Sequence, residues 1–221
     1  MNQNELAQNY SKVKSSIPPY VQLVVVSKTR LPAEIESLYQ MGQRDFGENR
    51  VQELKQKAEA LGHLSEIRWH MIGHIQTNKV NELLKIPHLH TIHSIDSIKL
   101  ANFLSSKILE KKLEVYIEVN IGGEEAKQGV RNLEGIIEVY DELTKIPNIK
   151  IAGLMGMAPI RIPSGISSEM AARESFQKLK KLSQFFHPEV FMLSMGMSSD
   201  YQIAIEEGST CVRVGSSIFN S

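Results

Sequence analysis

The sequence predicts an α/β fold, a single (β/α)8 TIM barrel with an extra N-terminal helix. Short apolar runs alternate with segments of helical periodicity along the 221 residues, and short connections between such units give parallel strands. About eight such units in roughly 200 residues fit a closed barrel. An open doubly wound sheet carries a glycine-rich phosphate fingerprint after its first strand, which is missing here. No Ser/Gly/Pro-rich linker divides the chain, so we expect residues 1–221 to form one domain.

The strands are predicted from runs rich in β-branched residues, which suit strands covered on both faces. The first run, VQLVVVS, and the fifth, LEVYIEVNI, carry this pattern clearly. In chain order, the predicted strands are residues 21–27, 45–47, 68–73, 89–95, 113–121, 149–157, 189–196 and 211–215.

The helices are predicted from apolar residues three and four positions apart. Residues 2–17 follow this spacing, and Pro18 ends the run because proline cannot continue a helix. Pro32 suits the first turn of the next helix, and Gly42 suits its end. Further helices are predicted at residues 51–61, between strand 68–73 and Pro87, and at 100–108, 133–143, 168–186 and 199–207.

Charge and composition exclude several classes of protein. Lys plus Arg and Asp plus Glu number 25 each, so no overall field favours nucleic acid or an anionic membrane. The lone Cys211 excludes an internal disulfide and fits a reducing cytosol. Met1 leads into a polar segment, and no apolar run approaches the roughly 18 residues of a membrane span. We therefore expect a cytoplasmic protein with no nucleic-acid or membrane partner.

Lys28 follows the first predicted strand, where barrels place their chemistry. It shares side-chain parity with Val24 and Val26, so we expect all three to point into the same core. Desolvation and the neighbouring Arg30 would lower the pKa of Lys28 and supply an amine for a Schiff base with an aldehyde such as pyridoxal phosphate. The alternative is a lysine whose stem packs on the strand end while its amine lies in water. Lys127, in a glycine-rich loop, is a second candidate amine.

The seventh and eighth predicted strands end in small, hydroxyl-rich turns. SMGMSS (194–199) follows one strand and GSS (215–217) the other, each before a helical pattern. Backbone N–H groups at helix starts, together with serine hydroxyls, bind anions, and barrels often place a phosphate at these two strands. Glycine-serine turns are also common in ordinary loops. Beside a lysine on the adjoining first strand, the two turns predict a phosphorylated aldehyde cofactor.

Arg213 lies two residues before Gly215 on the last strand, so both point inward by parity. An arginine inside a barrel needs a partner. A pyridine nitrogen is one such partner, and since arginine stays protonated that nitrogen would remain unprotonated, which weakens the ring as an electron sink. The alternative is an ion pair with an acid such as Glu118 or Glu48.

The histidines do not form a metal-binding pattern. His70 and His74 are four residues apart, but on a strand and a turn, and the glutamate of an HExxH motif is missing. His88, His90 and His93 have no cysteine or clustered acids beside them. We expect no metal site.

Several segments together resemble a known family. VVVSKT, FGENRVQEL, WHMIGHIQTNK, HSID, VNIGGEEAKQGV, GLMGM and LSMGMSSDYQIAIEEGSTCVRVGSSIF are similar to the YggS/PROSC family, the pyridoxal 5′-phosphate homeostasis proteins. The resemblance covers residues 21–219. It implies the fold of the barrel domain of alanine racemase, without that enzyme's second, β-rich domain.

The resemblance also implies a set of residues for pyridoxal 5′-phosphate. It assigns the aldimine to Lys28 and the pyridine nitrogen to Arg213, and it places Asn49 near the ring. The remaining members of the expected cofactor-binding set surround the phosphate, and they are Ser194, Ser198, Gly215 and Ser216.

Two classes of function fit this cofactor. In the first, the protein binds, buffers and delivers pyridoxal phosphate without turnover, with pyridoxal phosphate-dependent apo-enzymes as recipients. In the second, it is an amino-acid racemase-like enzyme. Racemisation needs two bases on opposite faces of Cα, and alanine racemase-like enzymes take the second from an extra domain for which this sequence has no room. We expect the carrier, as a monomer or weak dimer, and name Tyr116 as the residue to suspect if exchange at Cα occurs.

Overall fold

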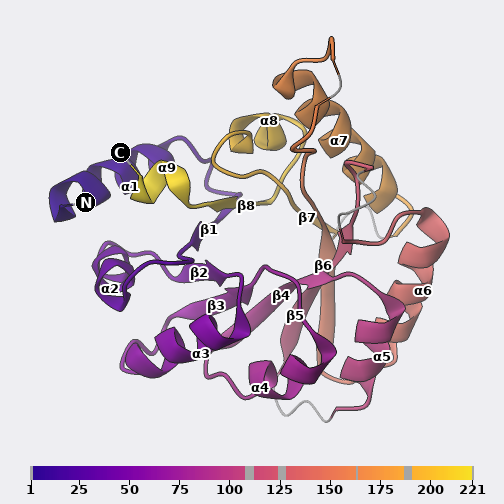
Figure 1. The fold of residues 1–221 in the computed structure, drawn as a ribbon, viewed down its shortest axis with the longest axis horizontal. Helices are drawn as coiled ribbons and strands as arrows, with labels where there is room; N and C mark the ends of the chain where they lie inside the picture. Colours follow the sequence, from indigo (N-terminus) through magenta and orange to yellow (C-terminus); the bar gives the residue numbers. More distant parts are fainter. Residues whose placement is uncertain (1, 108–111, 124–127, 163, 187–190, 221) are drawn as a thin grey trace.

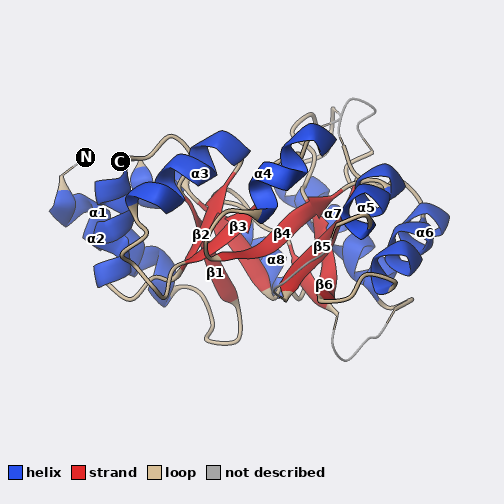
Figure 2. Ribbon diagram, turned by 90° about the horizontal axis from the view of Figure 1, so that it is seen from below, coloured by secondary structure: helices blue, strands red, loops and turns tan. Residues whose placement is uncertain are grey.

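The computed structural model in Figure 1 is a closed barrel of eight parallel strands. It describes residues 2–107, 112–123, 128–162, 164–186 and 191–220. Each strand pairs with the next in the sequence, and β8 pairs with β1 to close the sheet. Figure 2 shows the strands at the centre of the molecule, with helices around them. The predicted fold class is therefore confirmed.

The eight strands occur in the predicted order. They are β1 Gln22–Val26, β2 Asp45–Glu48, β3 Arg68–Met71, β4 Leu89–Ile95, β5 Leu113–Val119, β6 Ile149–Gly156, β7 Met192–Ser194 and β8 Cys211–Val214.

The helices also follow the predicted alternation. They are α1 Gln3–Ser15, α2 Pro32–Gln40, α3 Val51–Ala60, α4 Val80–Leu84 after the 3-10 turn Thr77–Lys79, α5 Ile98–Ser105, α6 Leu133–Thr144, α7 Ser168–Ser183, α8 Tyr201–Glu206 and α9 Ser216–Phe219.

Most elements are one to three residues shorter than predicted, because apolar residues continue into the turns that pack on the barrel. Strand β1 ends at Val26 and not at residue 27, and α7 ends at Ser183 and not at residue 186. Part of the predicted strand 189–196 and the last residue of the predicted helix 100–108 lie outside the described residues.

The starts of four helices are fixed by polar side chains that bond the backbone. The spacing of apolar residues, from which the helices are predicted, contains no information on these bonds. Asn2 and Glu5 form a reciprocal capping box at the start of α1, and the Ser97, Asn132 and Ser167 side chains accept a backbone N–H at the starts of α5, α6 and α7. Such caps satisfy backbone donors that have no partner inside the helix.

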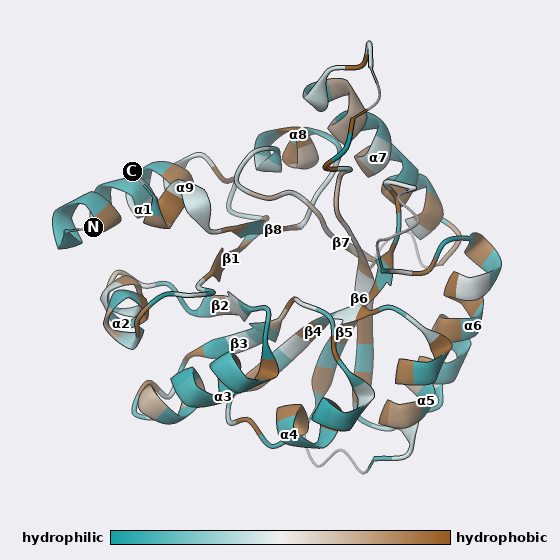
Figure 3. Ribbon diagram, viewed as in Figure 1, coloured by the Kyte–Doolittle hydropathy of each residue, from teal (hydrophilic) through white to brown (hydrophobic). Residues whose placement is uncertain are grey.

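The apolar core lies mainly between the strands and the surrounding helices. Leu23 and Val25 of β1 belong to this outer core, as do Phe46 and Trp69 on the next two strands. Figure 3 shows hydrophilic and hydrophobic residues side by side on α5 and α6, as expected for helices that cover a barrel with one face. No helix among the described residues is long and apolar enough to span a membrane.

The inside of the barrel is much more polar than the outer core. A small apolar cluster of Tyr116, Ala152 and Met155 lies there. Buried polar and charged side chains from β2, β3, β4, β7 and β8 contact one another there, and they are Asp45, His70, His93, Ser194 and Arg213. This interior positions the candidate site.

Candidate functional site at the carboxyl end of the barrel

The turns that follow β1 and β8 lie side by side at the carboxyl end of the barrel. β8 pairs in parallel with β1, and Gly215 packs on the end of β1. A Cβ at position 215 would lie 2.9 Å from the carbonyl oxygen of Val26, so glycine allows the close approach of the two backbones. The structure thereby brings the Lys28 turn next to the turn that begins α9 at Ser216.

A buried ion cluster holds the Lys28 turn from the side of α3. The Lys57 ammonium donates to Glu48 Oε1 at 2.8 Å and to Glu53 Oε1 at 2.6 Å. It also donates to the carbonyl oxygen of Ser27 at 2.7 Å, while the Ser27 hydroxyl donates to Glu48 Oε1 at 2.6 Å. The side chain of Glu48 is fully buried and that of Lys57 is 6% exposed, so the pair of Glu48 and Lys57 is shielded from water.

The cluster also fixes the residue after Lys28. The Thr29 N–H donates to Glu53 Oε1 at 2.5 Å, and Thr29 has a φ of 63°, in the left-handed region that non-glycine residues rarely adopt. Contacts on both sides of Lys28 therefore define its backbone.

The prediction that Lys28 points into an apolar core is wrong. Lys28 is exposed, in a turn beyond the end of β1, because strand alternation stops at Val26. Arg30, the expected neighbouring cation, donates to Asn220 Oδ1 at 2.5 Å and stacks over the Phe219 ring at 5.0 Å. The position of Lys28 at the mouth of the barrel agrees with the prediction, while the apolar surroundings and the cation do not.

Ser198 connects the two serine-rich turns. Its hydroxyl oxygen accepts from the N–H groups of Gly215 and Ser217, each at 3.2 Å, and its carbonyl oxygen accepts from the Ser217 hydroxyl at 3.3 Å. Ser216 is exposed beside them. Because the Ser198 hydroxyl oxygen accepts from two N–H groups, its own proton remains available to donate to a further acceptor, beside the exposed Ser216.

Ser194 and Arg213 meet inside the barrel and are both buried. Arg213 Nη1 donates to the Ser194 carbonyl oxygen at 2.8 Å and to its hydroxyl oxygen at 2.6 Å, and Nη2 donates to the Gly156 carbonyl oxygen at 3.4 Å. The predicted alternative is an ion pair with an acid such as Glu118 or Glu48. Glu48 instead binds Lys57 on the other face of the sheet, and among the described residues Arg213 donates to backbone and hydroxyl oxygens and not to Glu118.

Two histidines extend this contact across the barrel. His93 Nδ1 lies 2.9 Å from the Ser194 hydroxyl, and His93 Nε2 lies 2.9 Å from His70 Nδ1. His70 Nε2 in turn lies 2.9 Å from Asp45 Oδ1. We call this set the interior chain, and its members are Asp45, His70, His93, Ser194 and Arg213.

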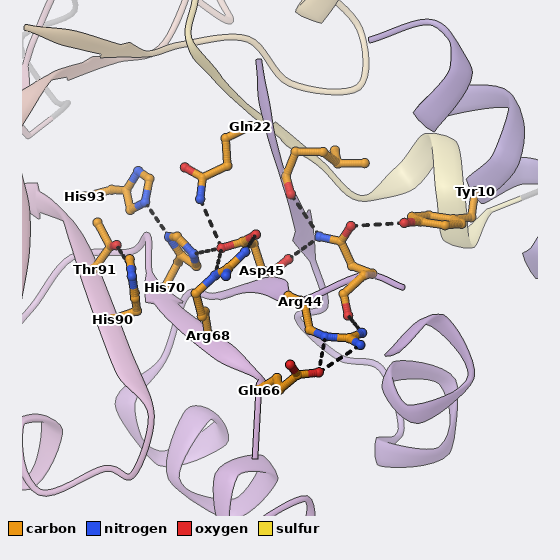
Figure 4. Close-up of polar contacts among 12 residues, drawn as sticks. Tyr10, Gln22, Arg44, Asp45, Glu66, Arg68, His70, His90, Thr91 and His93 are labelled. Carbon is orange, nitrogen blue, oxygen red and sulfur yellow. Dashed lines mark hydrogen bonds and ion pairs between the residues drawn. The ribbon is translucent and has the colours of Figure 1, made fainter. Parts of the chain in front are cut away.

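The Asp45 end of the interior chain is fixed by further donors, as Figure 4 shows for the part from His93 to Arg68. Arg68 donates to both carboxylate oxygens, at 2.8 and 2.6 Å, and Gln22 donates to Oδ1 at 3.0 Å. Burial by itself would raise the pKa of Asp45, but the hydrogen bonds from Arg68 and His70 hold it well below its usual range. Asp45 is therefore ionised at neutral pH.

The interior chain beyond Ser194 and Arg213 was not predicted from the sequence. The available signal was a polar side chain on each of three neighbouring predicted strands, namely Asp45, His70 and His93. Because a polar residue inside a barrel needs a polar partner, three of them at inward-facing positions indicate a connected network. The histidines were considered only as possible metal ligands. Among the described residues, no three His, Cys, Asp or Glu side chains are grouped to hold a metal ion.

Other predicted residues surround the mouth or lie below it. Asn49 is half-buried after β2. Tyr116 faces the interior, stacked on the His93 ring at 4.6 Å, and its hydroxyl donates to Met192 Sδ at 3.7 Å. Glu118 is buried on the same strand, and burial, reinforced by Asp96, raises the pKa of Glu118 to about 7.

Two other lysines serve for comparison with Lys28, and they are Lys79 and the second candidate amine, Lys127. Lys79 forms an ion pair with Glu82 at 3.1 Å. Lys127 lies outside the described residues.

Comparisons with known proteins agree with this architecture. A profile of the family described as "Alanine racemase, N-terminal domain" matches residues 1–221. The "Pyridoxal phosphate homeostasis protein" of Aquifex aeolicus is 40% identical over 204 residues, covering 90% of this chain and 86% of that protein. The human protein of the same name is 39% identical over 211 residues, covering 90% of this chain and 75% of its own length.

Solved structures extend the likeness to three dimensions. The structure of PipY from Synechococcus elongatus "with PLP bound" has a TM-score of 0.84 and 31% identity, covering 97% of this chain and 100% of that chain. Alanine racemase from Oenococcus oeni has a TM-score of 0.73 at 16% identity, covering 98% of this chain and 56% of that chain, which shows a shared fold alone. With relatives of this identity along nearly its whole length, the chain belongs to the family of pyridoxal phosphate homeostasis proteins, whose barrel is that of the alanine racemase N-terminal domain.

Proposed function

We propose that this protein binds pyridoxal 5′-phosphate at the carboxyl end of its barrel, buffers it and delivers it to apo-enzymes. The observation that carries the proposal is the placement of three kinds of group on adjoining strands and the turns that follow them. These are the exposed Lys28 after β1, the Ser198 and Ser216 hydroxyls in the turns after β7 and β8, and the buried guanidinium of Arg213 on β8. The names of the relatives, and the PLP bound in the PipY structure, support it.

The residues at this end fit the chemistry of the cofactor. A phosphate is held by backbone N–H groups and hydroxyls, and the Ser198 hydroxyl, which only accepts in the contacts described above, and the exposed Ser216 hydroxyl are candidates to donate to it. Gly215 fits closely on Val26 with no room for a Cβ, so the turn lies as near the barrel as the backbones allow. A guanidinium donates hydrogen bonds and accepts none, as a pyridine nitrogen requires.

Each predicted site residue has a role in this proposal. Lys28 would hold the cofactor through the aldehyde, which supplies reversible condensation with a primary amine. Arg213 would face the pyridine nitrogen, and Asn49 would lie near the ring. The phosphate would be bound by the remaining residues, which are Ser194, Ser198, Gly215 and Ser216.

We further infer that residues 1–221 act as one domain in the cytosol. The barrel closes between its first and last strands, so neither half of the sheet is complete alone. Cys211 is a buried free thiol, and this agrees with a reducing compartment.

The proposal includes no turnover of amino acids. The interior candidate for a second base is Tyr116, and its hydroxyl is bound to Met192. Burial raises the pKa of Tyr116 well above its ordinary value, so the phenol keeps its proton and cannot accept one from Cα. A racemase-like enzyme is the competing function, and proton exchange at Cα separates the two.

We expect negligible exchange of the Cα proton of alanine and other common amino acids. The protein, loaded with pyridoxal phosphate, is incubated with each amino acid in deuterium oxide, and deuterium at Cα is measured by mass spectrometry. Free pyridoxal phosphate and the Lys28→Ala variant are the controls. Exchange that depends on Lys28 and exceeds that of the free cofactor would establish an enzyme and contradict the carrier proposal.

The phosphate contacts predict a second result. Charge-assisted hydrogen bonds contribute about 1.5–3 kcal/mol each, so the double variant Ser194→Ala, Ser216→Ala should lower affinity for pyridoxal phosphate at least about 100-fold. Its affinity for unphosphorylated pyridoxal should change much less. Ser199→Ala, in the same turn and exposed, is the control and should bind like the parent. Equal losses for both ligands would place the phosphate elsewhere.

A further inference from the structure

The donors and acceptors of the interior chain are ordered by the residues at its two ends. At one end Arg213 can only donate hydrogen bonds, and at the other the ionised Asp45 can only accept them. The three residues between them, Ser194, His93 and His70, each join one neighbour to the next at 2.9 Å or less. The proton positions in between follow from these ends.

With both imidazoles neutral, one arrangement satisfies every contact. His70 Nε2–H donates to Asp45, which leaves His70 Nδ1 as an acceptor for His93 Nε2–H. His93 Nδ1 is then an acceptor, so the Ser194 hydroxyl donates to it and accepts from Arg213. Both histidines therefore carry their proton on Nε2. In this state the single proton of Ser194 is used inside the barrel, and Ser194 can donate to nothing at the mouth.

One added proton reverses the middle of the chain. A doubly protonated His70 donates to Asp45 from Nε2 and to His93 from Nδ1. His93 then carries its proton on Nδ1 and donates it to the Ser194 oxygen. The Ser194 hydroxyl now accepts from both His93 and Arg213, and its own proton is released for a third partner.

The surroundings favour His70 as the residue that gains the proton. His70 faces the Asp45 carboxylate at 2.9 Å, and this carboxylate also binds the cationic Arg68. The ring of the half-buried His90 lies 5.7 Å from the His70 ring, and burial lowers the pKa of His90, which favours its neutral form. Within the described ranges, His93 contacts no carboxylate. Burial, His70 and Arg213 all lower the pKa of His93 well below its usual range.

The remaining neighbours of His93 do not compete for the proton. Tyr116 stacks on its ring at 4.6 Å and stays neutral, since burial raises the pKa of Tyr116. Arg213 is a second permanent cation near Ser194.

We propose that the interior chain couples proton uptake to binding of a phosphorylated ligand, because one proton on His70 converts Ser194 from a donor to His93 into a donor to the phosphate. The proposal rests on the phosphate contact of Ser194 in the proposed function. A phosphate dianion accepts hydrogen bonds and donates none, so contact with Ser194 requires the reversed chain. His70 and His93 are thus positioning residues, which act through Ser194.

The first test uses the ligand-free protein. Nitrogen-15 and proton correlation spectra of the histidine rings distinguish the two neutral tautomers from the doubly protonated ring. At neutral pH we expect His70 and His93 to be neutral with the proton on Nε2. A proton on Nδ1 of either ring, or a charged His70 without ligand, would overturn the proposal.

The second test adds pyridoxine 5′-phosphate, which has an alcohol in place of the aldehyde and so cannot react with Lys28. We expect the His70 ring to become doubly protonated when this ligand binds. Titration calorimetry in two buffers of different ionisation enthalpy measures the protons taken up on binding. The wild-type protein should take up about one proton more than the Asp45→Asn variant. The same ligand titrates in both proteins, so its own protons cancel in the difference.

The control for this difference is His90→Gln. His90 lies beside the chain and contacts Thr91 at 2.7 Å, so its removal should leave proton uptake unchanged. If Asp45→Asn does not fold, the ring state of His70 in the wild-type complex decides. Binding with His70 still neutral would overturn this inference alone. Failure of the ligand to bind would contradict the proposed function, and the inference with it.

Discussion

Lys28→Ala is expected to abolish covalent attachment of pyridoxal phosphate. In the wild-type protein, borohydride treatment of the loaded chain should add one reduced cofactor to Lys28, and the variant should show no label above background. The variant should also lack the visible absorbance band of the loaded wild-type protein. Peptide mapping by mass spectrometry measures the label, and absorbance measures the band. The reason is the position of Lys28 at the mouth of the barrel, in the turn that lies next to Gly215 and the start of α9.

The stability of this variant should remain close to that of the wild type. Lys28 is exposed, and surface substitutions away from special features change the free energy of unfolding by less than about 0.5 kcal/mol. Lys79→Ala is the matched control, because Lys79 is a surface lysine paired with Glu82, and it should label like the wild type. A label on Lys79 or Lys127 in the native protein would contradict the assignment.

Lys57→Met is expected to lower the free energy of unfolding by about 3–5 kcal/mol, the range found when one partner of a buried ion pair is removed. Lys57 is the cation for Glu48 at 2.8 Å, and Glu48 is fully buried. The second carboxylate oxygen of Glu48, Oε2, already has no hydrogen-bond partner among the described residues. Without Lys57 only the Ser27 hydroxyl at 2.6 Å would oppose the charge of this carboxylate.

The loss of unfolding free energy caused by Lys57→Met should increase as pH rises. Burial raises the pKa of Glu48 above its ordinary value of 4.5 even with Lys57 in place, and removal of the cation raises it further. The folded protein then binds a proton that the unfolded chain releases, so stability falls as pH rises from the unfolded pKa through the folded pKa. Urea denaturation between pH 5 and pH 8, a window of about three units, should show the smaller loss at pH 5.

Lys55→Met is the matched control for this prediction. Lys55 is on the same helix, but its ion pair with Glu82, at 3.7 Å, is partly exposed. Such surface pairs contribute about 0–1 kcal/mol. A Lys57→Met loss that is the same at every pH would show that Glu48 is not the source of the penalty.

Much of the fold could be predicted because its signal is spread over many residues. Each strand and helix is marked by a regular spacing of apolar residues. An error at one position therefore leaves the number of predicted strands and helices unchanged. The boundaries were less accurate at the carboxyl ends of strands. At Lys28, two-residue alternation suggested an inward side chain, but the Ser27 carbonyl oxygen bonds Lys57 and Thr29 adopts a positive φ. A turn of this kind depends on a partner distant in the sequence.

The partners of the site residues were harder to predict than the residues themselves. Lys28 and Arg213 stand out because charge at a strand end or inside a strand is unusual. The Lys57 cluster joins residues from a strand and a helix, and no sequence period connects them. The interior chain likewise depends on the closure of the barrel, since His93 of β4 and Ser194 of β7 are not on neighbouring strands and meet across its interior.

The closure of the barrel between β1 and β8 has a consequence for the order of events during synthesis. Lys28 leaves the ribosome early, whereas Arg213 and Gly215 follow much later, and Asn9 of α1 bonds the Ile218 carbonyl oxygen of α9 at 3.3 Å. In Figure 1 the two ends of the chain lie side by side. A nascent chain therefore has Lys28 but not yet the residues of β8 that belong to the proposed site. A ligand that binds only the finished barrel stabilises complete molecules and leaves truncated ones unprotected.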